Sequence, residues 1–419
     1  MAKKSNLSLF VWGNFVSLLG SSMQRTALPL YILDLTGKGS IMSLLTLSHM
    51  VPMLLTTPLA GVIGDRANRK HIMVSMDIIR GLLILPLAIL GLQKNLTLSL
   101  IFLLMSLCAV FDSLFSAATS AMLPELVTEN KLRQANSYHS LFTSMADLLG
   151  PVLGALSYSI WGIGAIFVFN TLCYLISGFF EIFIKYSPQS QREKTSVKEF
   201  LASARAGLDF IVQNPQLKTF ASFCLLLNFL LAPIFSVVLP FSAKTELHLS
   251  ALTYGLMGSC LTAGFIAGAL ATGTILVKNP SGTLIKRGIL ATCTLTLLFS
   301  ILISPPLRLL FEPGKHIGTI ILLGLLTLLG IAISITNIPI RTDMQKLAPN
   351  HIRSRIFSSI ELLTQVAIPL SIAGGGLALD YIPSHLISAC FASFLFIAGI
   401  SFVKTIGTQG LIIPSKKAT

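Results

Sequence analysis

Three carboxyl groups interrupt long apolar stretches of this chain, and each is a candidate to carry a proton. Asp112, Asp147 and Glu361 have no obvious charged partner nearby in the sequence. An unpaired ionised acid is costly in lipid, so such groups mark ion pathways, and burial favours their neutral form. We expect one of them to couple proton movement to the work of the protein. The alternative is that one or two face neighbouring loops or pair with Arg25 or His49.

Two basic residues also lie inside predicted apolar spans. Arg25 is suited to three tasks: attracting an anionic substrate group, pairing with an intramembrane acid, or extending its long stem to the outer interface. Arg80 follows Asp77 by three residues, so a helix places both on one face as an ion pair. We expect that pair to be structural, near the inner membrane face, and coupled to Arg66 or Arg69 of the preceding loop.

Membrane helices must position these groups. Only 11% of the 419 residues are charged and 53% are hydrophobic, whereas a soluble protein carries about 25% charged residues. Apolar runs of about 18 residues or more are long enough to cross a bilayer. Twelve such spans are predicted, which makes the fold class all-α integral membrane: 7–33, 39–63, 71–92, 96–118, 138–160, 162–184, 217–243, 250–276, 284–304, 316–340, 356–379 and 384–404.

The basic residues predict how the spans are oriented. The net charge is +14, from 30 Lys and Arg against 16 Asp and Glu. If the N-terminus is inside, most of the Lys and Arg residues fall in cytoplasmic segments. Short loops rich in these residues remain in the cytoplasm, so both termini are expected there. This distribution explains the positive charge without nucleic acid as a partner.

The chain is predicted to consist of two related halves. The polar stretch 185–218 divides six spans from six, and Gly150-Pro151 in the fifth span matches Ile368-Pro369 in the eleventh. Pro and small residues are also common in membrane helices generally. We expect two pseudo-symmetric six-helix domains with a substrate site between them near the midplane. The domains are 1–187 and 217–419, and the cytoplasmic loop 188–216 carries an amphipathic helix, Val197 to Val212, on the inner membrane face.

A charged loop between two spans carries a family signature. Residues 61–70 read GVIGDRANRK, which resembles the loop motif G-x-x-x-D-R-x-G-R-K of the major facilitator superfamily, with Asn68 replacing the second Gly. Further segments resemble the branch that includes macrolide efflux proteins and the enterobactin exporter. These include LGSSMQ at 19–24, AMLPELV at 121–127 and QKLAP at 345–349. The resemblance implies the major facilitator fold and secondary transport, with a proton gradient as energy source and no cofactor.

The resemblance assigns the charged loop to an inner gate formed by Gly61, Asp65, Arg66, Arg69 and Lys70. It implies that Asp65 caps a helix of the other half when the gate closes, since a carboxylate at a helix N-terminus gains about 0.3–1 kcal/mol. The alternative is ordinary positive charge at the inner face. In either case the loop lies outside the apolar core of the bilayer.

Other positions both follow the family pattern and depart from it. Gly150, Pro151 and Gly154 resemble the span-five motif of antiporters, in which small residues allow close helix packing and proline bends the helix. This favours export by antiport over uptake. Many exporters of the superfamily carry an Arg in the fourth span, where this chain has Asp112. The usual coupling scheme is therefore not expected to transfer.

We expect a proton-coupled exporter of amphiphilic small molecules, such as drugs or macrolides, in a bacterial cytoplasmic (inner) membrane. Its partners are the substrate, protons and the lipid bilayer, and it is expected to act as a monomer without a metal. A siderophore exporter or a lysophospholipid flippase of the same fold stays open, with Arg25 then holding a phosphate. The sequence lacks a G-x-x-x-x-G-K-[ST] loop, which argues against an ATP-driven pump. A membrane-embedded enzyme is the remote alternative.

Overall fold

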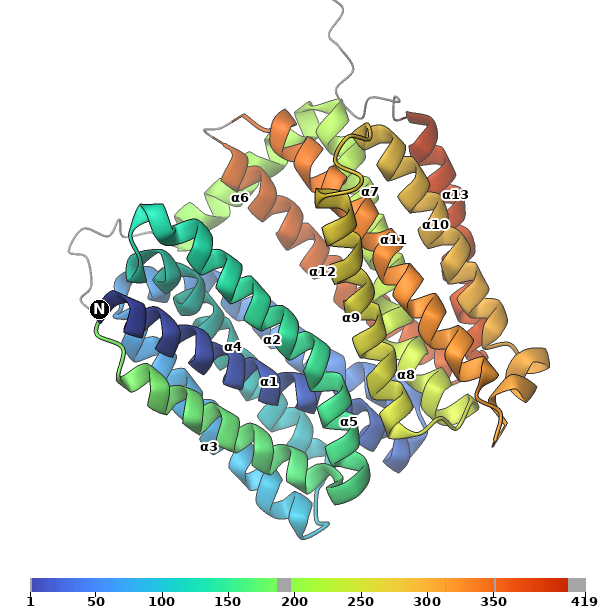
Figure 1. Ribbon diagram of the computed structural model, residues 1–419, viewed down its shortest axis with the longest axis horizontal. Coiled ribbons are helices and arrows are strands. Elements are labelled where there is room, and N and C mark those ends of the chain that lie inside the picture. Colours follow the sequence, from blue (N-terminus) through green and yellow to red (C-terminus); the bar gives the residue numbers. More distant parts are fainter. Residues whose placement is uncertain (1, 187–196, 313, 350–351, 406–419) are drawn as a thin grey trace, which may run out of the picture. The chain divides into compact units, whose positions relative to one another are not determined.

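The computed structural model describes residues 2–186, 197–312, 314–349 and 352–405, and every element in these ranges is helical (Figure 1). Most are α-helices; η1 and η2 are π-helical, and η3 is a 3₁₀ helix. The elements are α1 (Ala2–Thr36), α2 (Gly39–Arg66), α3 (Arg69–Leu92), α4 (Leu98–Leu126), α5 (Glu129–Ile182), α6 (Val197–Gln213), α7 (Pro215–Pro233), η1 (Ile234–Val238), α8 (Leu239–Phe241), η2 (Ser242–Glu246), α9 (Ala251–Gly273), α10 (Ser281–Leu302), η3 (Pro305–Phe311), α11 (Ile317–Leu347), α12 (Arg353–Leu379) and α13 (Ser384–Thr405).

Ten helical segments of the described ranges are long and apolar enough to cross a membrane. One of them, α5, runs through two predicted spans and bends at Gly162, whose φ of 77° and ψ of −175° are not helical. Glycine adopts positive φ without a Cβ clash, which accounts for the break at this position. Helix α1 is absent from the ten, because Asn14, Gln24 and Arg25 lower its hydropathy. With α1 added and α5 counted twice, the helices match the twelve predicted spans.

The seventh predicted span is continuous but unevenly wound. The π-helical segments η1 and η2 flank Leu239–Phe241, where Pro240 lies. A proline inside a helix removes a hydrogen bond and its ring clashes with the preceding turn, and a wider π turn relieves that clash. The local irregularity thus has a cause in the sequence.

Two compact units make up the chain. Unit 1 consists of Met1–Gly37, Leu44–Phe200 and Ser250–Ser259. Unit 2 consists of Lys38–Ser43, Leu201–Leu249 and Cys260–Thr419. Most of α6 therefore belongs to unit 2, whereas the sequence assigns this helix to a separate central loop.

Unit 1 is built around α5, along which α1 and α3 both pack. The close approach of α1 depends on glycine: a Cβ placed on Gly154 would lie 2.7 Å from the Cα atom of Met23. Small residues are what allow membrane helices to pack backbone to backbone. At one end of this unit, a buried cluster centred on Phe10, Met73 and Met122 joins α1, α3 and α4.

In unit 2, α10 packs against α11 and α13, and α7 packs against α12. Helix α6 lies on α12, where Ser359 Oγ donates a hydrogen bond to the Ala204 carbonyl oxygen at 2.8 Å. Ala204 and Ile211 are buried. The sequence predicts an apolar face on lipid for this helix. At Ala204 and Ile211, that face is covered by protein instead.

Candidate functional site

A chain of charged side chains crosses the interior of unit 1. His49 Nε2 lies 2.9 Å from Asp112 Oδ2, and Arg80 Nη1 donates to Asp112 Oδ1 at 2.6 Å. The second amino group of Arg80 donates to Asp77 Oδ1. Ser17 Oγ also donates to that oxygen, at 3.3 Å. Helices α1, α2, α3 and α4 each contribute at least one member, so one connected network links four elements.

Arg80 is the central cation of this network and is 4% exposed. Its guanidinium carbon lies 4.1 Å from the ring centroid of Phe115 and 4.4 Å from that of Tyr174. Aromatic faces attract a cation and replace part of its lost hydration. Arginine suits this position because its planar group stacks on rings while its amino groups bind two carboxylates. The cation is thus fixed between two rings and two acids.

Exposure falls along the network. The side chains of His49 and Asp112 are 31% and 21% exposed, whereas that of Asp77 is 0% exposed. The His49 end of the network is therefore the more exposed one, and the Asp77 end is fully buried.

A further buried acid of unit 1, Glu181, was not among the candidates predicted from the sequence. It is fully buried on α5, and neither carboxyl oxygen has a hydrogen-bond partner among the described residues. A Cβ on Gly13 would lie 3.6 Å from Glu181 Cγ, and one on Gly178 would lie 3.5 Å from Asp77 Cβ. Glu181 and Asp77 thus border the same junction of α1, α3 and α5. Glu181 lies near the end of the sixth predicted span, beside a polar linker, and at such a position the sequence does not distinguish a buried acid from an interfacial one.

The three predicted acids are not equivalent. Two of them have the partners that the alternative interpretation of the sequence named: Asp112 pairs with His49 as above, and Asp147 Oδ1 lies 3.1 Å from Arg25 Nη2. Glu361 lies in unit 2, is exposed, and accepts a hydrogen bond from Gln365 at 3.0 Å. The Arg25 and Asp147 side chains are 62% and 45% exposed, so this pair lies at the surface of the protein. Only Asp112 belongs to the buried network.

Arg80 has a partner that the sequence did not predict. Asp77 and Arg80 form an ion pair, and Arg80 also reaches Asp112 on α4, whereas Arg66 of the basic loop has its side chain outside the described residues. Arg69 instead donates to Glu125 Oε1 at 2.7 Å and to the Ala121 carbonyl oxygen at 2.7 Å. Arg80 lies about 16 Å along α3 from Arg69 at the usual helical rise, so the two guanidinium groups bind at different levels of the helix.

The motif loop is held by helix-terminal contacts. The Asn68 side chain caps α3 by accepting hydrogen bonds from the backbone N–H groups of Lys70 and His71. Asparagine is among the best N-cap residues, so the replacement of the family glycine has a local structural reason. Lys70 Nζ donates to the Ile182 carbonyl oxygen at 2.6 Å, and Tyr186 donates to Glu125. The side chains of Asp65 and Arg66 lie outside the described residues.

The span-five motif forms a packing seam in unit 1. A Cβ on Gly150 would collide with the Ser22 side chain, and the backbone of Met23 lies against Gly154. The other side of the motif faces the beginning of α9: a Cβ on Gly258 would lie 3.3 Å from Pro151 Cβ. The two glycines bring α1 close, while the proline contacts a further helix.

Comparison with known proteins matches the chain to the Major Facilitator Superfamily over residues 10–372. It is 25% identical over 205 residues to macrolide efflux protein A of Streptococcus pyogenes, a match that covers 49% of this chain and 51% of that protein. The chain thus spans about half the length of that curated relative. It is also 25% identical to the multidrug efflux pump Tap of Mycolicibacterium fortuitum, over 91% of each chain. The crystal structure of the nucleoside transporter NupG shares the fold, with a TM-score of 0.73, 15% identity, and coverage of 96% of this chain and 98% of that one.

Proposed function

Because the chain belongs to the Major Facilitator Superfamily, we propose that it expels amphiphilic small molecules in exchange for protons. It is an all-helical, multi-pass membrane protein of a family of small-molecule transporters, and not an enzyme. The proposal specifies the direction of transport, the coupling ion and the substrate class.

The buried network around Arg80 carries the proposal. Replacing a buried ion pair with apolar residues is often neutral or stabilising, so packing alone does not explain two acids bound to one buried guanidinium and a third acid buried nearby. Intramembrane ionisable groups mark ion pathways. The network binds Asp77 and Asp112 to the single cation Arg80, with His49 at its exposed end, and the unpartnered Glu181 lies buried at the same helix junction as Asp77. At least one acid must be protonated to limit the buried net charge.

We assign the proton to Asp112 and Glu181 in turn. Asp112 is the reachable acid, and adding a proton to its carboxylate removes one of the two charges that hold Arg80. The guanidinium is then freer to move toward Asp77 and Glu181, and release of the proton restores the starting charge. Glu181 has no donor in the described structure, so it holds its charge least readily. Protonation thus changes where the cation of unit 1 rests.

Several observations support export and a membrane setting. Two relatives are named for macrolide and multidrug efflux, and the Gly150-Pro151-Val152-Leu153-Gly154 segment resembles an antiporter motif. The distribution of Lys and Arg favours cytoplasmic termini. We place the protein in a bacterial cytoplasmic membrane and infer that it acts as a monomer, because one chain supplies both halves of the fold.

Proteoliposomes with an inward proton gradient test this proposal. Internal pH and solute movement would be followed together for a macrolide, a lipophilic cation, a catecholate siderophore and a lysophospholipid. Solute-dependent proton flux that is lost in Asp112→Asn and kept in Glu361→Gln is expected. Glu361 is a matched control, because it is an intramembrane acid that lies exposed in unit 2. Solute movement without proton flux would overturn antiport and favour a uniporter or a flippase.

A further inference from the structure

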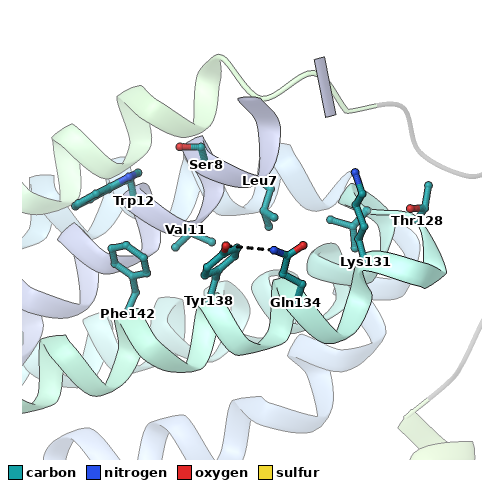
Figure 2. Close-up of a pocket in the computed structure, with 10 residues that line it drawn as sticks. Leu7, Ser8, Val11, Trp12, Thr128, Lys131, Gln134, Tyr138 and Phe142 are labelled. Atoms are coloured by element: carbon teal, nitrogen blue, oxygen red, sulfur yellow. Dashed lines mark hydrogen bonds between the residues drawn. The ribbon is translucent and has the colours of Figure 1, made fainter. Parts of the chain in front are cut away.

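Unit 1 contains a cavity of about 440 Å³ between the beginnings of α1 and α5 (Figure 2). Its size falls within the usual range for small-molecule sites, about 300–1,000 Å³. No acidic residue is among the described residues that line it, which are Leu7, Ser8, Val11, Trp12, Val127, Thr128, Lys131, Gln134, Tyr138 and Phe142. The distribution of basic residues assigns this end of the helices to the cytoplasm. The cavity is separate from the Arg80 network and shares no residue with it.

One end of the cavity is aromatic and rigid. The ring centroids of Trp12 and Phe142 lie 4.9 Å apart at an interplanar angle of 68°, and both rings contact Phe15 at 5.8 and 5.5 Å. Edge-to-face contacts of this kind stabilise the rings in fixed positions. Trp12 nevertheless keeps 48% of its surface exposed. The apolar face of the Trp12 ring is therefore fixed in position and only partly covered by other side chains.

The other end of the cavity is cationic and polar. Figure 2 shows Lys131 and Thr128 at the end away from Trp12 and Phe142, with Gln134 and Tyr138 between. Gln134 Nε2 donates to Tyr138 Oη at 3.2 Å. Lys131 is exposed and forms no ion pair with a described residue. Its ammonium group is free to receive an anion.

We infer that this cavity binds a single-chain amphiphile with an anionic head and a ring-bearing apolar body. The head is held by Lys131 and the body lies on Trp12 and Phe142. A lipophilic cation of the same shape would meet Lys131 with no acid to offset the repulsion. The inference rests on the proposed function and narrows its substrate from amphiphiles in general to anionic ones that load from the cytoplasmic side.

The two tryptophans of the chain provide the test. Trp12 lies in the cavity and Trp161 lies elsewhere on α5. In the Trp161→Phe protein in phosphatidylcholine nanodiscs, Trp12 is the remaining energy donor, so energy transfer reports on probe at the cavity. In the Trp12→Phe protein, Trp161 is the donor, and energy transfer reports on probe dissolved in the bilayer. The probes are dansylamino-undecanoate and the matching dansylamino-undecylamine, which share a body and differ in the charge of the head.

We expect saturable energy transfer from Trp12 to the carboxylate probe and about tenfold weaker binding of the amine, as for loss of one charge-assisted contact. In the Trp161→Phe background, Lys131→Gln should weaken binding of the carboxylate probe by a similar factor, and Lys131→Arg should retain the affinity for this probe. Equal binding of the two probes, or no effect of Lys131→Gln, would overturn the inference. Loss of carboxylate binding when phosphatidylglycerol replaces phosphatidylcholine would overturn it in favour of a bilayer lipid as occupant.

This binding measurement needs no proton gradient, so it separates the two proposals. If binding fails while solute-dependent proton flux is intact, only the assignment of this cavity falls. If binding succeeds while proton flux is absent, the cavity stands and antiport falls.

Discussion

Arg80 Nη1 lies 2.6 Å from Asp112 Oδ1, and this contact joins the third helix to the fourth inside unit 1. The same guanidinium binds Asp77 on its own helix. Two acids therefore share one cation, and a proton on either acid changes the balance between them. Substitutions that remove one charge at a time should reveal this balance.

Asp112→Asn should abolish proton coupling while the protein still folds. The amide keeps the size of the side chain but removes the charge and the proton site, so Arg80 keeps one ionised partner. We expect substrate-driven proton flux to fall to the level of protein-free liposomes, because the amide cannot bind and release a proton. Flux is measured with an internal pH dye, and normal flux in this variant would show that Asp112 does not carry the proton.

Arg80→Ala should destabilise the protein strongly. Removing one partner of a buried ion pair leaves an uncompensated charge at a cost of about 3–5 kcal/mol. Asp77 would be left in that state, since its side chain is 0% exposed. Thermal unfolding in detergent measures the loss. Asp77→Asn combined with Arg80→Gln should recover part of it, and no recovery would mean that packing on Phe115 and Tyr174 dominates.

Glu181→Gln should leave stability unchanged or slightly higher. The buried carboxyl has no hydrogen-bond donor among the described residues. A neutral amide of similar shape therefore loses no hydrogen bond and avoids the cost of a buried, unpaired charge. The infrared band of a protonated carboxyl at neutral pH should also disappear in this variant. If the band is the same in both proteins, Glu181 is ionised and the proposed order of protonation is wrong.

Glu246→Gln is the matched contrast to Glu181→Gln, and it should destabilise the protein. Glu246 accepts hydrogen bonds from Arg308 at 2.6 Å and from the Ser384 hydroxyl and backbone N–H at 2.6 and 3.1 Å. Loss of this charge should cost about 1–3 kcal/mol, measured by thermal unfolding alongside Glu181→Gln. Equal stability of both variants would contradict the distinction between a donor-rich and a donor-free acid.

Asn68→Ala should weaken the start of α3. It removes the side-chain oxygen that accepts from the Lys70 and His71 backbone, at a cost of about 0.5–2 kcal/mol. Asn68→Gly, which restores the family motif, should cost only a few tenths of a kcal/mol, because glycine is tolerated at an N-cap. A larger loss of thermal stability in the Gly variant than in the Ala variant would refute the capping role.

Gly154→Ala should disturb the seam between α1 and α5. The new methyl group would lie 2.7 Å from Met23 Cα, and overpacking of a close contact costs about 1–3 kcal/mol. Gly324→Ala in α11 is the control, since a Cβ there has no atom within 4 Å. The control should be neutral or stabilising, as expected for Gly to Ala inside a helix. Equal effects at both sites would argue against the seam.

Much of the fold follows from the sequence because bilayer thickness sets the length of apolar runs. Even the bend of α5 at Gly162 falls at the first residue of the sixth predicted span. The partners of the acids do not follow, since His49 and Asp112 are 63 positions apart and Arg80 and Asp112 are 32 apart. Such pairs depend on which helix faces meet. Glu181 was missed for a related reason: near the end of a span, a buried acid and an interfacial one have the same local sequence.

The polar side chains of α1 have a consequence for how the protein is made. Asn14 lies 2.9 Å from His139, and Gln24 accepts a hydrogen bond from Asn170 at 2.7 Å, so these partners are 125 and 146 positions later in the chain. During synthesis α1 reaches the membrane before either partner exists. Its amide groups must stay near water, or near the insertion machinery, until α5 arrives. Unit 1 therefore cannot assemble one helix at a time. Helix α1 reaches its final packing only when α5 is in place.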